Sequence, residues 1–412
     1  MNQRLFIRVN QLFYLNPMKR LLVLLSCCLF MACSPSRHIS REPHIPILGW
    51  YSIPPGEHAT LEHYREMKEA GFDYSFSHIY SYEDALQALD LCAQVGMKSI
   101  FMCPELETSP EEVVASVKDH PGLGGYFLRD EPGDDAMDAL GEWTRRIESV
   151  DKDHPCYLNL LPSCVFTVDA YKKHLRLFTE KVDLPQISFD CYPVNETDGN
   201  YCLNPRWYEN LELVLAECRH SGKPFWAFAL ATAHGSYPIP TIDHLRLQMY
   251  SNLAYGAQLL QYFTYWNPGT EQWDFHQAPI TIDGYRSPVY ELVRQMNEEI
   301  QRRAFVWDGC SVERVSHIAD TIPVGTKPLT QHPSHFNKIQ SDKGCGLVSE
   351  ISNGDRHFVM FVNTSPAEDW YVQIETDDCV QLVRNDGSSV PAVNYGPLFI
   401  LSPGNCNIFE VK

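Results

Sequence analysis

The stretch Gly125-Tyr126-Phe127-Leu128-Arg129-Asp130-Glu131-Pro132 passes from apolar residues into three consecutive charged residues and a proline. A short apolar run that ends in this way is typical of a buried β-strand followed by a loop. It is the fourth of eight such runs, which we number as expected strands one to eight: 47–53, 74–80, 98–104, 125–130, 156–161, 186–193, 224–232 and 259–266.

Segments of helical period lie between and after these runs. Their apolar residues recur three and four positions apart, at 61–70, 82–95, 136–150, 168–181, 207–221, 242–255 and 288–303. Gly71, Gly96 and Gly222 come directly after three of these segments, where a left-handed helix end favours a residue without Cβ. The alternation predicts a (β/α)8 TIM barrel over residues 47–303, with the active site at the carboxyl ends of its strands.

The period changes in residues 304–412. Short alternating runs over 346–351, 357–362, 370–374, 380–384 and 397–401 are separated by turn sequences such as Asn353-Gly354-Asp355. Helical segments are missing from this part of the sequence, so we expect a smaller all-β sandwich after the barrel.

The first 46 residues are expected to lie outside both domains. Met18-Lys19-Arg20 precedes a dozen residues rich in apolar side chains, which end at Cys33. This pattern predicts a signal peptide over residues 1–32, with Met18 as an alternative start, because the run is too short for a transmembrane helix. Its end resembles a bacterial lipoprotein signal, which implies lipidation of Cys33 and a tether over 33–46.

Charge excludes one class of partner. The 33 Lys and Arg against 52 Asp and Glu give the 412-residue chain a net charge of −19. Removal of residues 1–32 takes away four positive charges and no negative charge, so the mature chain carries −23. A surface this acidic repels phosphate backbones, and we therefore expect no nucleic-acid partner.

Cysteine and histidine spacing gives no sign of a metal site or a cofactor. Fourteen cysteines are present, and eleven of them follow Cys33, so they cannot all pair within the chain. None stands in a CxxC or Cys/His arrangement typical of zinc, and we expect no metal and no cofactor. In an oxidising compartment one disulfide can form among Cys310, Cys345, Cys379 and Cys406.

The ends of the expected strands and their loops carry acids and aromatic rings. The candidate residues, in chain order, are Trp50, His78, Tyr80, Glu105, Asp130, Glu131, Asp190, Tyr192, His234, Tyr265 and Trp266. Rings cover the apolar faces of sugars, and carboxylates bind hydroxyls and transfer protons. A carbohydrate is therefore the expected substrate, and the long loop that holds Trp273, Asp274 and His276 is expected to fold over the pocket.

The Asp130-Glu131-Pro132 triplet resembles the clan of retaining glycoside hydrolases that has Asn-Glu-Pro at the end of strand four. The resemblance implies that Glu131 is the general acid/base and that Asp130 takes the place of the sugar-binding Asn. The architecture is also similar to that of lipoproteins of gut Bacteroidetes that combine such a barrel with a β-sandwich. This implies a location in the bacterial cell envelope, with a lipid anchor in the outer membrane on its periplasmic side or at the cell surface.

One departure from that clan concerns the second carboxylate. The clan has its nucleophilic Glu at the end of strand seven, but residues 224–234 contain no acid. Asp190 at the end of strand six is the first candidate to replace it, and Glu105 is the second. If the second carboxyl group lies about 5 Å from that of Glu131, it is expected to act as a nucleophile. At about 6.5 to 9.5 Å it is expected to act as a base that activates water.

The sequence is also compatible with other interpretations. Glu131 also fits a helix N-terminus, and Asp190 also fits a carboxylate bound to its own turn. The missing acid on strand seven is compatible with a glycan-binding lipoprotein without turnover. A barrel enzyme that acts on sugars by elimination or isomerisation is a third hypothesis. The leading hypothesis is a glycoside hydrolase that acts on a glycan fragment.

Overall fold

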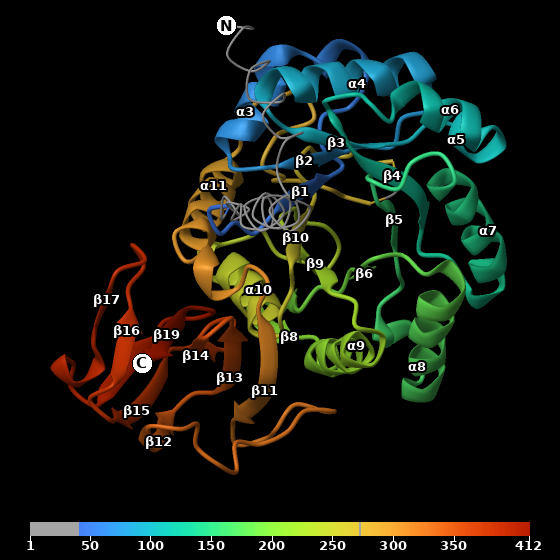
Figure 1. Cartoon of the computed structure of the whole chain (residues 1–412). Coiled ribbons are helices and arrows are strands. Elements are labelled where there is room, and N and C mark those ends of the chain that lie inside the picture. Colours follow the sequence, from blue (N-terminus) through green and yellow to red (C-terminus); the bar gives the residue numbers. More distant parts are fainter. Residues whose placement is uncertain (1–40, 272) are drawn as a thin grey trace, which may run out of the picture. The chain divides into compact units, whose positions relative to one another are not determined.

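The centre of the fold is a parallel sheet of eight strands in a computed structural model that describes residues 41–271 and 273–412 (Figure 1). The strands are β1 (Ile47–Trp50), β2 (Tyr74–Phe76), β3 (Lys98–Phe101), β4 (Leu123–Asp130), β5 (Cys156–Asn159), β6 (Ile187–Phe189), β9 (Phe225–Leu230) and β10 (Leu259–Phe263). Their order is β5-β4-β3-β2-β1-β10-β9-β6. A parallel bridge from Leu160 to Phe189 joins β5 to β6, so the sheet closes and the predicted barrel is confirmed.

Helices surround this barrel (Figure 1). They are α3 (Leu61–Glu69), α4 (Tyr82–Val95), α5 (Glu105–Thr108), α6 (Pro110–Val117), α7 (Met137–Glu148), α8 (Val168–Leu177), α9 (Trp207–Ser221), α10 (Ile242–Ala254) and α11 (Pro288–Gln301). Thr60, Ser81, Thr167 and Thr241 each accept a hydrogen bond from the backbone N–H three residues later, which fixes where α3, α4, α8 and α10 begin. Gly96, with φ of 71°, ends α4 in the left-handed conformation.

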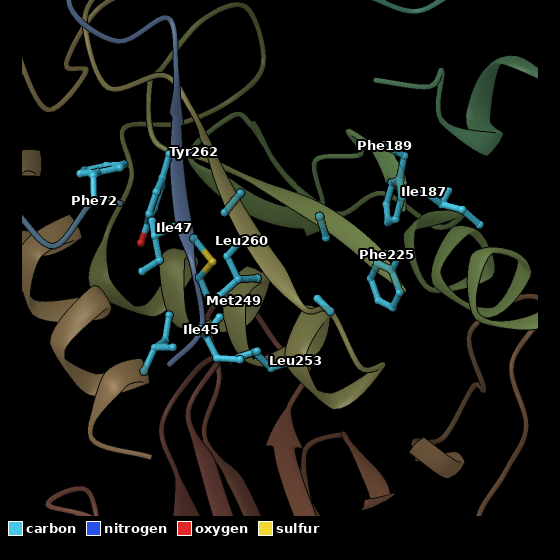
Figure 2. Close-up of a cluster of buried hydrophobic side chains, with 14 of the residues drawn as sticks. Ile45, Ile47, Phe72, Ile187, Phe189, Phe225, Met249, Leu253, Leu260 and Tyr262 are labelled. Carbon is cyan, nitrogen blue, oxygen red and sulfur yellow. The ribbon is translucent and has the colours of Figure 1, made fainter. Parts of the chain in front are cut away.

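The outer face of the barrel packs against the helices through apolar side chains. Figure 2 shows Ile45 and Ile47 gathered with Met249, Leu253 and Leu260, all of them fully buried. Ile47 is paired in register with Leu260, and both belong to the main hydrophobic cluster. This layer joins the first and last barrel strands to α10.

The interior of the barrel is filled mainly by aromatic rings. Trp50 contacts the rings of Phe76, Phe127, Tyr157 and Phe228, at centroid distances of 4.6, 5.4, 5.9 and 5.5 Å. These rings come from strands on all sides of the barrel, and the predominantly tilted and edge-on angles between them suit aromatic packing. Together with apolar residues of the barrel strands they form one buried cluster inside the barrel.

The C-terminal part is all β apart from short turns. Its strands are β11 (Ser311–Ile318), β12 (Phe336–Lys343), β13 (Gly346–Asn353), β14 (Arg356–Asn363), β15 (Trp370–Thr376), β16 (Val380–Val383), β17 (Ser389–Pro391), β18 (Leu398–Leu401) and β19 (Cys406–Val411). One antiparallel sheet has the order β11-β13-β14-β19-β16-β17, and the other has β12-β15-β18. Phe361, Trp370 and Phe409 belong to one buried cluster that both sheets share, as in a sandwich.

The barrel and the sandwich share a second core. Leu347, Met360 and Ile408 of the six-stranded sheet belong to the same buried cluster as the outer face of the barrel. The Ser349 hydroxyl donates a hydrogen bond of 2.6 Å to the carbonyl oxygen of Ala254, at the end of α10. Residues 43–412 therefore form one compact unit.

Two further predictions concern the chain ends and the cysteines. Residues 1–32, Cys33 and most of the expected tether lie outside the described residues. No helix within 41–271 and 273–412 is long and apolar enough to cross a membrane. All eleven described cysteines are free thiols, so the disulfide considered for the sandwich is not formed in this structure.

The shared core predicts that the two parts unfold together. Met360→Ala is expected to lower the free energy of unfolding by about 2 to 5 kcal/mol, because a buried side chain is lost at the junction. Urea unfolding followed by tryptophan fluorescence and by circular dichroism should give one coincident transition for the variant. Ile400→Ala, on the exposed face of β18, is the control and should change stability by less than about 0.5 kcal/mol. A separate early transition in Met360→Ala would contradict the shared core.

Candidate active site

A cavity of about 750 Å³ opens at the carboxyl ends of the barrel strands. Its walls come from the ends of β1, β4, β5, β6, β9 and β10 and the loops after them. The lining side chains include Trp50, Tyr51, Asp130, Glu131, Asn159, Cys164, Asp190, Cys191, Tyr192, Phe228, His234, Tyr237, Phe263, Glu271, Trp273 and Phe275. A cavity of this size at this end of a barrel is where TIM-barrel enzymes bind their substrates.

Two carboxyl groups touch each other in this cavity. Glu131 follows β4, Asp190 follows β6, and their side chains are in hydrogen-bonding contact. The surrounding protein desolvates both groups and raises the pKa of each, and the negative charge of Glu131 raises the pKa of Asp190 further. Because two carboxylates in contact repel each other, the pair retains one shared proton above the pH at which a free carboxyl group loses it.

A chain of hydrogen bonds fixes this pair from behind. The Asn159 side-chain amide donates to Asp190 Oδ1 over 2.7 Å, and Asn159 Oδ1 accepts from the Ser188 hydroxyl over 3.0 Å. Gln261 Nε2 donates to the Ser188 oxygen over 2.9 Å. The Glu131 backbone N–H also donates to the Asn159 carbonyl oxygen over 2.8 Å. Asn159 therefore positions both members of the pair, and its own supports Ser188 and Gln261 are buried in the barrel.

Asp130 adds a third carboxyl group beside the pair. Its side chain is accessible from the cavity, but the surrounding protein removes much of its bulk water. This desolvation and the charge of Glu131 raise the pKa of Asp130 to about 6, while a hydrogen bond from Asn159 opposes the shift. Asp130 thus titrates near pH 6 rather than near the ordinary pKa of an aspartate side chain.

The backbone is strained at two of the residues that line the cavity. Glu131 has a φ of 45° and Tyr51 a φ of 43°, both in the left-handed region that residues other than glycine rarely adopt. Such conformations cost about 1 to 3 kcal/mol each and occur often at functional sites. At Glu131 this left-handed conformation occurs directly after the end of β4, where the carboxylate lines the cavity.

Aromatic side chains form the floor and one wall of the cavity. Trp50 and Phe228 lie at the floor and are almost fully buried. On the wall, His234 contacts the rings of Phe275 and Trp273 at centroid distances of 4.6 and 6.1 Å. Burial lowers the pKa of His234, so its imidazole is neutral at pH 7. Trp273 is 58% exposed and offers its ring at the opening.

The loop after β10 is held over the site as the sequence predicts. Backbone hydrogen bonds of 3.0 Å run in both directions between Ala233 and His276. The Asp274 carboxylate accepts a hydrogen bond of 2.7 Å from the Gly235 N–H. These contacts tie the loop to the end of β9, and they bring Trp273 and Glu271 into the lining.

The structure places five of the candidate residues outside the cavity lining. Glu105 is the exposed first residue of α5, and Tyr80 is 73% exposed. His78 packs against Trp50 with 5.8 Å between the ring centroids. Tyr265 and Trp266 are buried within the outer layer, because their side chains turn from the end of β10 toward the helices. Of the predicted sugar-binding residues, Trp50, Asp130, Tyr192 and His234 do line the cavity, together with Glu131 and Asp190.

Several lining residues could not be found by inspecting the strand ends. Asn159 is the last residue of β5, but its neighbours in the sequence include no acid that would draw attention to it. Glu271 and Phe275 lie on either side of Trp273 in the loop after β10. The sequence signal for them was the prediction that this loop folds over the pocket. Cys164 follows a proline turn after β5.

Comparison with known proteins gives the fold independent support. The chain matches a solved beta-galactosidase from Bacillus circulans sp. alkalophilus with a TM-score of 0.61 and 10% identity, over 90% of this chain and 100% of that one. A catalytic mutant of a GH42 beta-galactosidase from G. stearothermophilus matches with a TM-score of 0.60 and 10% identity, over 90% and 98%. At these identities the similarity shows the fold alone.

Residues 134–303 match the family described as Glyco_hydro_42, beta-galactosidase. The family match supports a glycoside hydrolase. No curated protein matches the chain. A beta-galactosidase from the psychrophilic Marinomonas ef1 matches with a TM-score of 0.49 and 12% identity over 62% of this chain, and the chain spans 60% of that protein's length. The segment that matches the family, residues 134–303, begins just after the Asp130-Glu131-Pro132 triplet.

The raised pKa of Asp130 predicts a stability effect that depends on pH. The folded protein holds this proton to about pH 6, whereas the unfolded chain releases it near pH 4, so Asp130 costs stability as the pH rises through that window. Asp130→Asn should therefore stabilise the protein by about 1 kcal/mol at pH 7, after allowance for exposure, and by much less at pH 4. Thermal melts at both pH values measure this, with Asp135→Asn on the exposed turn before α7 as the control. An equal gain in stability at both pH values would contradict the raised pKa of Asp130.

Proposed function

We propose that the protein hydrolyses glycosidic bonds, with Glu131 as the general acid/base. The observation that carries the proposal is the contact between the Glu131 and Asp190 carboxyl groups in a cavity lined by aromatic rings. A glycoside hydrolase needs a carboxylic acid that keeps its proton above the ordinary carboxyl range, and desolvation raises the pKa of Glu131 in that direction. The family match and the solved structures with the same fold make β-galactosides the first substrates to test.

The chemistry follows from the shared proton. Glu131 gives its proton to the glycosidic oxygen as the bond to the sugar breaks, and Trp50 and Phe228 at the floor exclude water beneath the ring. Two adjacent carboxylates then remain, and their mutual repulsion makes the pair a good acceptor for the proton of the incoming water. The same group can therefore act first as an acid and then as a base.

A carboxylate on the far side of the sugar is still required. Asp190 touches Glu131, which is closer than the separation of about 5 Å or more between carboxylates that flank a sugar. Glu271 also lines the cavity, and it follows β10, which stands opposite β4 in the closed ring of eight strands. We therefore assign Glu271 as the facing carboxylate and Asp190 as the residue that positions the proton of Glu131.

The Glu131 assignment predicts a loss that depends on the leaving group. Glu131→Gln should lower kcat/KM on a disaccharide by about 10²- to 10⁴-fold, because no acid protonates the leaving oxygen. The loss should be much smaller with a dinitrophenyl galactoside, whose leaving group needs no proton. Glu271→Gln should reduce hydrolysis of both substrates. Glu105→Gln, outside the cavity, is the matched control and should keep the full rate.

Steady-state kinetics on both substrates decides the assignment. If Glu131→Gln keeps full activity on the disaccharide, Glu131 is not the acid. If the loss is equal for both leaving groups, the residue does not act by proton donation.

The missing acid at the end of β9 favours a second candidate function. The strand is followed by Ala231-Thr232-Ala233-His234, so the position where the related clan has its nucleophile carries no carboxylate. A glycan-binding protein without turnover would keep the aromatic floor and lose the facing acid. Calorimetry that shows sugar binding, with no product detected by chromatography after long incubation, would favour this function over hydrolysis.

We also propose that the protein is anchored to the bacterial cell envelope through Cys33. The support is the basic start, the short apolar run and the cysteine that ends it. Cys33→Ala should move the protein from the membrane fraction to the soluble fraction of cells that express the full chain. Cys27→Ala, inside the apolar run, is the control and should leave the protein in the membrane fraction. Retention of the Cys33 variant at the membrane would contradict the anchor.

A further inference from the structure

Two cysteines line the cavity beside the carboxyl pair. Cys164 lies in the turn Ser163–Val165 after β5, and Cys191 directly follows Asp190 at the end of β6. The bridge between β5 and β6 brings these two segments together, and the two thiols are in hydrogen-bonding contact. Cys164 is exposed to solvent, whereas Cys191 is buried behind it. Neither thiol has a part in the proposed hydrolysis.

The surroundings give the two thiols different reactivity. A hydrogen bond from Cys191 and the positive charge of Arg206 favour the Cys164 thiolate. They lower its pKa to about 6 against the opposing effects of partial desolvation and the charge of Glu131. The same hydrogen bond, together with burial, raises the pKa of Cys191. At pH 7 the outer sulfur is therefore a nucleophile and the inner one keeps its proton.

We propose that Cys164 and Cys191 form a thiol–disulfide exchange site that takes a disulfide of low molecular mass. The Cys164 thiolate attacks one sulfur of that disulfide, its S–S bond breaks, and one small thiolate leaves. Cys191 then loses its proton to solvent, and its thiolate attacks Cys164 Sγ. The mixed S–S bond breaks, and the second small thiolate leaves and takes up a proton. Two protein thiols are oxidised, and one small disulfide is reduced to two thiols.

The arrangement differs from that of a structural cysteine. An attacking thiol must be accessible and a resolving thiol must lie next to it, and Cys164 and Cys191 meet these two conditions. Cys202 is the other exposed cysteine within the described residues, and it lies on the hairpin strand β8 (Asn200–Leu203). Cys202 therefore serves as a matched control for exposure alone.

Closure of the disulfide has a consequence for the cavity. It would tie the turn after β5 to the residue that follows Asp190, and so restrict the wall beside Glu131. Oxidation is therefore expected to reduce hydrolysis at least several-fold, and a dithiol reductant should restore it. This consequence rests on the proposed function, but formation of the disulfide does not.

The test uses oxidised glutathione with the whole protein at pH 7. After incubation, free thiols are blocked under denaturing conditions, and the peptides are identified by mass spectrometry without reduction. The wild type is expected to yield a peptide pair joined through Cys164 and Cys191, with no glutathione attached. Cys191→Ser should instead accumulate glutathione on Cys164. Cys202→Ser should behave as the wild type does.

Three results would overturn the inference. The first is recovery of both thiols in the reduced form, and the second is stable glutathione on Cys164 in the wild type. The third is a disulfide between either cysteine and another residue. Cys164→Ser removes an exposed thiol and should fold normally, and it should leave Cys191 unmodified. If the disulfide forms but no glycoside is cleaved, the proposed function fails while the exchange site stands.

Discussion

Closure of the parallel sheet between β5 and β6 is the constraint on which the site depends. The bridge from Leu160 to Phe189 brings Asn159 beside Asp190, and the pairing of β4 with β5 brings Glu131 to the same place. Three strand ends that are far apart in the sequence thus deliver three polar side chains to one point. The aromatic packing around Trp50 fills the space below them, so these side chains stand at the floor of a cavity and not in a solid core.

The site is assembled at a cost to the stability of the fold. Asp130, Glu131 and Asp190 all have raised pKa values because the surrounding protein desolvates them, and the charge of Glu131 further disfavours the charged forms of Asp130 and Asp190. Glu131 also has a backbone conformation that its side chain does not favour. Such costs are tolerated because the hydrogen bonds of Asn159 and the closed barrel hold the groups in place. Such unfavourable features are typical of a functional site, because a core selected for stability alone would avoid each of them.

The sandwich is a structural part of the barrel. Its six-stranded sheet packs against the barrel core through buried side chains such as Met360, and Ser349 binds the last carbonyl of α10. α10 lies between this sheet and the barrel strands β9 and β10, which lead into the wall of the cavity (Figure 1). The sandwich thus supports the side of the barrel from which His234 and the loop after β10 project.

The sequence by itself determined the order of elements, because the period of the apolar residues changes where strands, helices and the sandwich begin. It also predicted the place of Glu131 and Asp190 at the carboxyl end of the barrel, since acids that directly follow buried parallel strands lie at that end. Only the tertiary structure decided which strand ends meet. Glu105 and Tyr265 follow strands as Asp190 does, yet a helix start exposes the first and the outer layer buries the second. Asn159, Glu271 and the Cys164–Cys191 contact became visible only with the ring closed, because proximity across a barrel leaves no periodic signal in the chain.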